Sequence, residues 1–166
     1  TGDEPLTVSQ TLPNLDGVVI VTTPQEVALL DSRKSINFAK TISVPVLGVV
    51  ENMSGYTLSG TAEAGSKFSM IGPKGVPIDI TASPQGKWSV TLDLFKSGGG
   101  EDSAHELEVP FLGRLPFDPG VVRGGDDGVH RIVAEPEGET ALSFSKVVEE
   151  ILSSLEKGDI HQVKIT

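Results

Sequence analysis

The stretch VPVLGVVENMSGY (Val44–Tyr56) joins an apolar run to a polar end. The run up to Val50 is rich in valine and does not alternate with polar residues, which is typical of a strand buried on both faces of a parallel sheet. Asn52 follows as a polar tip, at the edge where open parallel sheets bind ligands. The stretch therefore predicts a buried parallel strand that ends at a candidate ligand edge.

Two further apolar runs predict strands on either side of this one. DGVVIVTT (Asp16–Thr23) precedes it, and VPFLGRLP (Val109–Pro116) follows it at a distance. Between the first two runs, Pro24–Ser43 is a predicted helix with Thr23 as its N-cap, and its spacing places on one face Leu29, Ser32, Ile36 and Ala39. The order strand, helix, strand predicts a βαβ unit with a right-handed crossover. A closing helix is predicted over TALSFSKVVEEILSSLEKG, with apolar residues at Phe144, Val148, Ile151 and Leu155.

The segment after Tyr56 has a different pattern and is too long for an ordinary connection between a strand and a helix. VPIDITA and KWSVTLDLF are typical of strands, and SPQG (Ser83–Gly86) between them is typical of a turn. The predicted fold class is therefore α/β, a partial doubly wound parallel sheet with an inserted antiparallel β element. We expect residues 1–56 and 95–166 to form one discontinuous domain and residues 57–94 to form the insertion.

Composition excludes several classes of partner and site. The net charge of −10 argues against nucleic acid and anionic membranes as main partners, since both require clustered lysine and arginine. The 166 residues contain no cysteine, so they offer neither a disulfide nor a thiolate ligand. No apolar run is long enough to span a membrane as a helix, and the first residues do not resemble a signal peptide.

Three segments in this order resemble a known family: TGDEPLTVSQTLP, the stretch from DGVVIVTTPQEVALLDSRKS to GVVENMSGY, and VPFLGRLPFDPGVVRGGDDG. They are similar to the C-terminal half of an Mrp/ApbC-type P-loop ATPase of the MinD/ParA group, an ATP-dependent iron–sulfur cluster carrier. The resemblance covers about two-thirds of the chain. It implies a P-loop NTPase-like fold, ATP with Mg²⁺ as cofactors of the complete protein, a homodimer, and a cytoplasmic location.

The sequence departs from that family in two places. The Gly-rich, Lys-containing phosphate loop would lie upstream of Thr1, and the family's Cys-x-x-Cys pair is replaced here by Thr57–Leu94. We therefore expect the chain alone to bind no cofactor and to be catalytically silent. A P-loop-bearing N-terminal segment, where one exists, would be its partner. A fragment, a processed product and a chimera without evolved function are the three origins consistent with this pattern.

The resemblance assigns candidate nucleotide contacts to six residues. Asn52 would contact the base, because an amide donates and accepts as an adenine edge requires; the alternative is that it caps a turn. Pro116, Phe117 and Asp118 would wrap the adenine, or simply end a strand. Gly2 and Asp3 follow the position of the switch loop that senses the γ-phosphate, or belong to a solvated terminus.

Other chemistry-bearing residues have plainer interpretations. Asp126 and Asp127 form a pair of adjacent carboxylates that is more typical of a solvated loop than of a metal site. The histidines are scattered without metal-ligand spacing. Gly98–Gly100 lacks the lysine of a phosphate loop and is interpreted as a hinge before a short helix. Trp88 is expected in the core of the insertion.

A second functional hypothesis does not involve an enzyme. LSGTAEAGSKFSMIGPKGVPIDITASPQGKWSVTLD resembles part of a bacterial Ig-like adhesin repeat. In this hypothesis the parallel sheet is a scaffold, and the insertion mediates self-association or adhesion through its edge strands.

Overall fold

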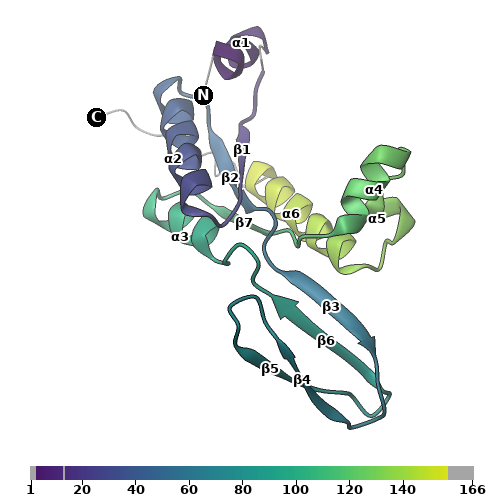
Figure 1. The fold of residues 1–166 in the computed structure, drawn as a ribbon. Coiled ribbons are helices and arrows are strands. Elements are labelled where there is room, and N and C mark those ends of the chain that lie inside the picture. Colours follow the sequence, from purple (N-terminus) through teal and green to yellow (C-terminus); the bar gives the residue numbers. More distant parts are fainter. Residues whose placement is uncertain (1–2, 13, 157–166) are drawn as a thin grey trace.

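The computed structural model describes residues 3–12 and 14–156 (Figure 1). The elements in chain order are α1 (Asp3–Thr11), β1 (Val18–Thr22), α2 (Glu26–Thr41), β2 (Val46–Glu51), β3 (Tyr56–Thr61), β4 (Lys67–Ile71), β5 (Pro77–Thr81), β6 (Lys87–Leu92), α3 (Gly99–Glu106), β7 (Phe111–Arg114), α4 (Pro119–Asp127), α5 (Arg131–Ala134) and α6 (Glu139–Glu156).

The three predicted strands form one parallel sheet in the order β1-β2-β7. Val19 pairs with Gly48 and Ile20 with Val49, while Val49 pairs in turn with Phe111. All six residues of the central strand β2 are buried. The predicted direction and neighbourhood of the strands are confirmed, and their carboxyl ends meet at one edge of the sheet.

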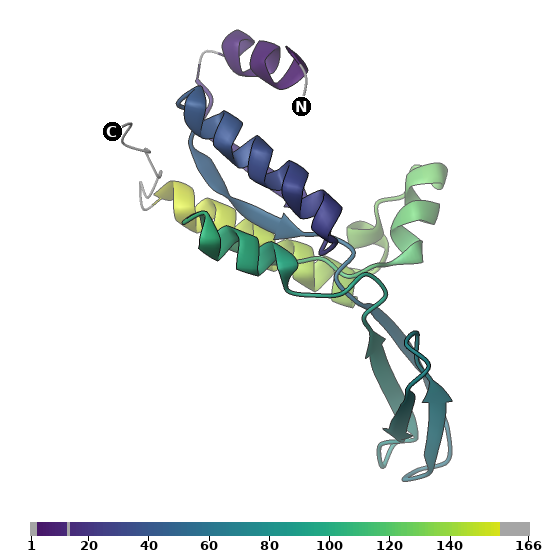
Figure 2. The same ribbon diagram turned by 60° about the vertical axis from the view of Figure 1, so that its left-hand side comes forward.

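Helices cover both faces of this sheet (Figures 1 and 2). On one face, Ile36 and Ala39 of α2 and Ala104 of α3 pack on the strands. On the other face, Val147 of α6 packs on β2 and β7. The expected inner face of α2 is confirmed: its buried residues are Leu29, Ser32, Ile36 and Ala39.

Some local expectations were wrong. The strand β1 is not buried on both faces: 60% of Val21 is exposed, and β1 lies at the edge of the sheet that the described residues form. The helix α2 begins at Glu26 with Gln25 at the N-cap position, so Thr23 is not the cap. The inner face of α6 uses Val147, and Val148 is exposed.

Residues 56–92 form an arm that projects from the carboxyl edge of the sheet (Figures 1 and 2). Here β3 pairs with β6 and β4 pairs with β5, both antiparallel, as two separate two-stranded sheets. The turn at Ser83–Gly86 is present, because the Gly86 N–H donates to the Ser83 carbonyl at 2.8 Å. It joins strands of different sheets. Trp88 lies inside the arm, edge-on to Phe68, and a Cβ on Gly60 would come within 2.7 Å of its ring.

Three helices were not anticipated from the sequence: α1, α4 and α5. In the described part of the chain, no helix has both the length and the apolar content to cross a membrane. The predicted end of the closing helix at Gly158 lies outside the described residues, as does the tail after it.

Candidate functional site

The loops that follow β2 and β7 are fastened to each other at the carboxyl edge of the sheet. The Ser54 N–H donates to the Leu115 carbonyl at 3.0 Å, and the Phe117 N–H donates to the Gly55 carbonyl at 2.8 Å. These hydrogen bonds join residues that are 61 and 62 positions apart in the chain. Two loops that carry predicted base contacts therefore form one continuous edge.

Asn52 begins the loop after β2, and its position is fixed by its backbone. Its N–H donates to the Thr22 carbonyl at 2.7 Å, and its Oδ1 accepts from the Met53 N–H at 2.9 Å. The Met53 backbone has a φ of 58°, so this bond stabilises a left-handed turn. Within the described residues the Asn52 Nδ2 has no hydrogen-bond acceptor. The side chain thus caps a turn and keeps a free donor, beside a hollow of about 340 Å³ that also borders Thr22 and Thr23.

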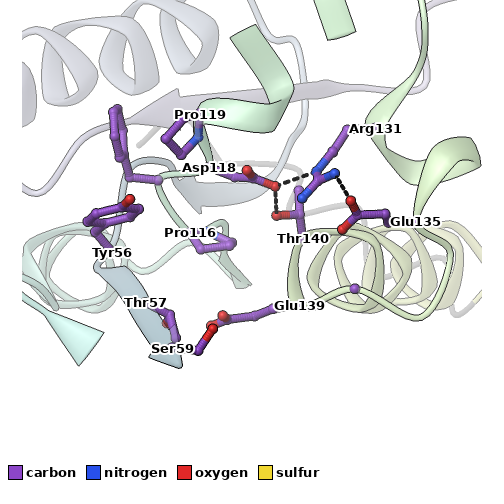
Figure 3. Close-up of a pocket in the computed structure, with 12 residues that line it drawn as sticks. Tyr56, Thr57, Ser59, Pro116, Asp118, Pro119, Arg131, Glu135, Glu139 and Thr140 are labelled. Carbon is purple, nitrogen blue, oxygen red and sulfur yellow. Dashed lines mark hydrogen bonds and ion pairs between the residues drawn. The ribbon is translucent and has the colours of Figure 1, made fainter. Parts of the chain in front are cut away.

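Pro116, Phe117 and Asp118 line a different pocket, of about 180 Å³ (Figure 3). Its other walls are the base of β3 and the segment that joins α5 to α6. The Phe117 ring meets the Tyr56 ring edge-on, with 5.7 Å between the ring centroids. The structure therefore gathers these three residues, but it places them in a separate hollow from Asn52.

The Asp118 carboxylate is occupied by structural contacts (Figure 3). Its Oδ1 accepts from the Gly120 N–H at 2.7 Å, which caps α4. Its Oδ2 accepts from the Thr140 hydroxyl at 2.7 Å and from Arg131 Nε at 2.8 Å. Partial burial raises the pKa of Asp118, but the bonds from Thr140, Arg131 and Gly120 outweigh this and leave the pKa below its ordinary value. A ligand that bound the Asp118 carboxylate would therefore compete with these three partners.

The two predicted phosphate-side residues are not part of this edge. Gly2 lies outside the described residues. Asp3 is the first residue of α1, a helix where the sequence had indicated a loop. Figure 1 places α1 beyond the amino end of β1, at the opposite end of the sheet from the loop after β2. Asp3 is therefore not brought together with Asn52.

Sequence reasoning missed Glu51, the residue immediately before Asn52. Its side chain is 0% exposed, which is unusual for a carboxylate. It accepts from the Ser54 hydroxyl at 2.5 Å, the Gly100 N–H at 2.6 Å and the Gly98 N–H at 3.1 Å. The Arg114 Nε lies 3.4 Å from its Oε1. One available signal was the glutamate at the end of an apolar strand in a sequence that also contains three consecutive glycines.

The pKa of Glu51 is shifted by opposing effects. Burial raises the pKa, whereas the hydrogen bonds from Ser54, Gly100 and Gly98 and the charge of Arg114 lower it. The net result is a pKa below the ordinary glutamate value, so the carboxylate is ionised at neutral pH.

Among the described residues, this edge carries no group of side chains arranged to bind a metal ion. Asp126 and Asp127 are exposed and end α4, so the loop expected there is a helix. Over residues 3–12 and 14–156, no three His, Asp or Glu side chains are arranged to hold a metal ion.

Comparison with families places the chain among iron-transfer NTPases. The ParA model, described as NUBPL iron-transfer P-loop NTPase, matches residues 1–82 and 78–152. The iron–sulfur cluster carrier protein of Methanocaldococcus jannaschii is 35% identical over 156 residues, which cover 94% of this chain and 44% of that protein. The carrier protein of Synechocystis is 38% identical over 151 residues, 91% of this chain and 35% of that protein. The cytosolic Fe-S cluster assembly factor NUBP2 homolog of Trichoplax adhaerens is 35% identical over 93% of this chain and 49% of its own length.

The chain thus spans less than half the length of these curated relatives. The chain also covers less than half of two solved structures that have a similar fold. The cell division ATPase MinD of Pyrococcus furiosus gives a TM-score of 0.52 at 22% identity, covering 83% of this chain and 43% of that one. The septum site-determining protein MinD of Pyrococcus horikoshii, complexed with Mg-ADP, gives a TM-score of 0.53 at 20% identity, covering 90% and 45%.

Proposed function

We propose that this chain, which belongs to the ParA/NUBPL family of iron-transfer P-loop NTPases, contributes the base-side edge of a nucleotide site in an iron–sulfur cluster carrier. The observation that supports the proposal best is the free Nδ2 donor of Asn52 at the carboxyl end of the central strand. Ligands of open parallel sheets bind at this edge. The carrier would work in the cytoplasm as a homodimer.

The residues present fit one part of a nucleotide. The Asn52 side chain offers a donor to a base, and the Pro116–Phe117 turn is bonded to the same edge. ATP with Mg²⁺ would supply the phosphoryl group and its counter-ion to the complete carrier. The 166 residues include no G-x-x-x-x-G-K-[ST] motif, whose backbone amides and lysine cradle phosphates. Under this proposal the chain by itself does not hydrolyse ATP, and Gly2 and Asp3 act only alongside a phosphate-binding segment.

The cluster itself is cargo rather than a cofactor of these residues. Iron–sulfur clusters are held mainly by cysteine thiolates, and this sequence contains none. The side chains of these 166 residues therefore offer no thiolate ligand to a cluster.

A nitrogen-15 NMR titration of the 166-residue chain with adenosine, ADP and ATP tests the proposal. We expect all three to shift the Asn52 side-chain amide with similar dissociation constants of about 1 mM, the weak affinity of a few contacts. Asn52→Asp keeps the Oδ1 that caps Met53 but removes the Nδ2 donor, and with it the side-chain signal. In this variant the backbone amides of Met53 and Ser54 are followed instead, and adenosine should no longer shift them. The exposed Asn37→Asp is the matched control.

Three outcomes would contradict the proposal: no response at Asn52, an equal response to guanosine, or an equal loss in the Asn37 variant. Binding of ATP much tighter than adenosine, or ATP turnover, would contradict the claim that the chain alone lacks a phosphate grip.

A second candidate function is supported by the projecting arm. Residues 56–92 form two short sheets whose outer strands have unpaired edges, which can add strands from another chain. We propose that residues 57–94, which resemble part of an Ig-like repeat, are a separable binding module. Self-association in sedimentation that becomes weaker when residues 57–94 are removed would support it. Association that is unchanged by the removal would exclude it.

A further inference from the structure

All four groups around the Glu51 carboxylate are hydrogen-bond donors. They are the Ser54 hydroxyl, two backbone amides and an arginine. A glutamine at this position would direct its own NH₂ donors at one of them, because an amide has a single acceptor oxygen. The site therefore requires the ionised carboxylate, and a shape-matched neutral residue cannot replace it.

The same carboxylate explains one of the glycines at the start of α3, and a left-handed backbone explains another. Gly98 is the N-cap residue with a φ of 89°, a left-handed conformation that favours glycine. A Cβ on Gly100 would lie 2.9 Å from the Glu51 Cβ and 3.0 Å from its Oε2. At Gly100 the backbone lies so close to the carboxylate that a side chain would not fit there. The amides of Gly98 and Gly100 therefore donate to a negative charge at the start of the helix.

The bonds of Glu51 come from three segments that meet at the candidate edge. Ser54 belongs to the loop of Asn52, Arg114 ends β7, and Gly98 lies where the chain returns from the arm. We infer that Glu51 is a positioning residue: its carboxylate holds the Asn52–Ser54 turn against β7 and the start of α3. The effect of Glu51 on base binding rests on the proposed function, whereas its effect on the Asn52–Ser54 turn rests on the geometry alone.

Stability alone is a poor explanation for this arrangement. Replacing a buried ion pair by well-packed apolar side chains is often neutral or stabilising. A buried charge with four donors instead fixes one arrangement of the loops around it, since any other leaves donors or the carboxylate unpaired. Among residues 3–12 and 14–156, Arg114 is the one charged side chain that pairs with Glu51, and it also pairs with Glu101 of α3.

The test compares Glu51→Gln with Glu101→Gln in the 166-residue chain. Both remove a carboxylate that contacts Arg114, but Glu101 is exposed, and within the described residues its side chain bonds Arg114 and not the Asn52 loop. We expect Glu51→Gln to shift the amide signals of Asn52, Gly98 and Gly100 and to weaken adenosine binding about tenfold, equivalent to about 1.4 kcal/mol. Glu101→Gln should change affinity less than about twofold.

A pH titration of the unmodified chain gives a readout that a general loss of stability would not produce. Lowering the pH through the folded-state pKa of Glu51, which lies below the ordinary glutamate value, should move the Asn52 and Gly100 signals toward their positions in Glu51→Gln, while the chain remains folded. Gly100→Ala should move them too, because it displaces the carboxylate without removing its charge. Gly125→Ala is the matched control, since its added Cβ would meet no described atom within 4 Å beyond its chain neighbours and its own helix backbone.

The results separate the two claims. Unchanged Asn52 signals in Glu51→Gln, or equal changes in Glu101→Gln, would overturn the positioning role. If Glu51→Gln does not fold, the pH titration and Gly100→Ala decide the question. If the unmodified chain binds no adenosine, the proposed function fails, and the signals of the Asn52 turn still decide whether Glu51 positions it.

Discussion

Asp118 shows how one carboxylate organises the segment after the parallel sheet. It caps α4 through Gly120 and also bonds Arg131 and Thr140, so it joins α4, α5 and α6. The side chain is 16% exposed and therefore only weakly screened by solvent. The sequence had indicated an adenine contact here, whereas the structure gives the side chain three partners within the protein.

We predict that Asp118→Asn lowers the free energy of unfolding by about 1–2 kcal/mol at neutral pH, the usual cost of losing a cap and a charged hydrogen bond. The asparagine retains one acceptor for Gly120 but directs an NH₂ group at Arg131. Urea denaturation of both proteins at pH 7 measures the difference.

The pH dependence of this difference identifies its cause. The pKa of Asp118 is lower in the folded protein than its ordinary value of about 3.9. Its contribution is therefore complete above that value and is lost as the pH falls through the folded-state pKa. The gap between the two proteins should close at low pH. A gap that stays constant down to pH 3 would show that the ionised carboxylate is not responsible.

At the scale of elements, the helix α2 has an N-terminus that can be improved. Gln25 occupies the N-cap position with φ −80° and ψ 138°, and its side chain makes no capping bond. We predict that Gln25→Asp stabilises the protein by about 1 kcal/mol, because aspartate accepts from the first free amides and places a negative charge at the positive end of the helix.

Thermal unfolding measures this gain, with Gln25→Ala as the control that should change little. A destabilising Gln25→Asp would mean that the contact of the Thr23 hydroxyl with Gln25 Oε1, at 3.2 Å, matters more than the cap.

The same helix shows what a sequence can predict. Its apolar spacing identified the buried face correctly, because that pattern is local. Its start was misplaced, because Pro24 is buried and its carbonyl packs closely on Gly99 of α3. Such a contact is between residues 75 apart in the chain, and no local pattern reports it.

In the candidate site, too, a local pattern identified one residue, whereas contacts between distant residues were not predicted. Asn52 was found because a polar residue after a buried strand is a local signal. The role of Glu51 depends on Gly98, Gly100 and Arg114, which lie 47 to 63 residues further along the chain. The helix α4 was missed because its glycine content disfavours a helix, and Asp118 compensates as its cap.

The arm is the element whose independence is easiest to test. No residue of 57–94 belongs to either buried cluster of the α/β part. Tyr56 pairs with Leu92, so the two ends of the arm lie side by side. We predict that replacing residues 57–94 by a short Gly-Ser linker leaves cooperative unfolding intact and changes the melting temperature by no more than about 4–8 °C, equivalent to about 1 kcal/mol.

This variant keeps Tyr56 and Phe95, whose rings pack edge-on against Phe117. Circular dichroism during heating provides the measurement. Loss of a cooperative transition would mean that the arm and the α/β part form one folding unit.

At the scale of the whole molecule, the most exposed feature of the sheet is the outer edge of β1. Within the part of the chain that the structure describes, its backbone groups pair with β2 on one side only, and Val21 is 60% exposed. The strand has the sequence VVIVT, without the lysine or proline that commonly protects edge strands. An exposed, apolar edge of this kind favours pairing with a strand from another chain, despite the net charge of −10.

We therefore predict that the 166-residue chain associates at high concentration through β1, and that Val21→Lys weakens this association. Val133→Lys on α5 is the matched control, since it adds the same charge at a residue that is 77% exposed but lies outside the sheet. Sedimentation velocity over a concentration series should show the Val21 variant as a monomer at concentrations where the unmodified chain and the Val133 variant associate. Because β1 lies in the α/β part, this association should survive replacement of residues 57–94. Equal association in all of these proteins would show that the edge of β1 is not the contact.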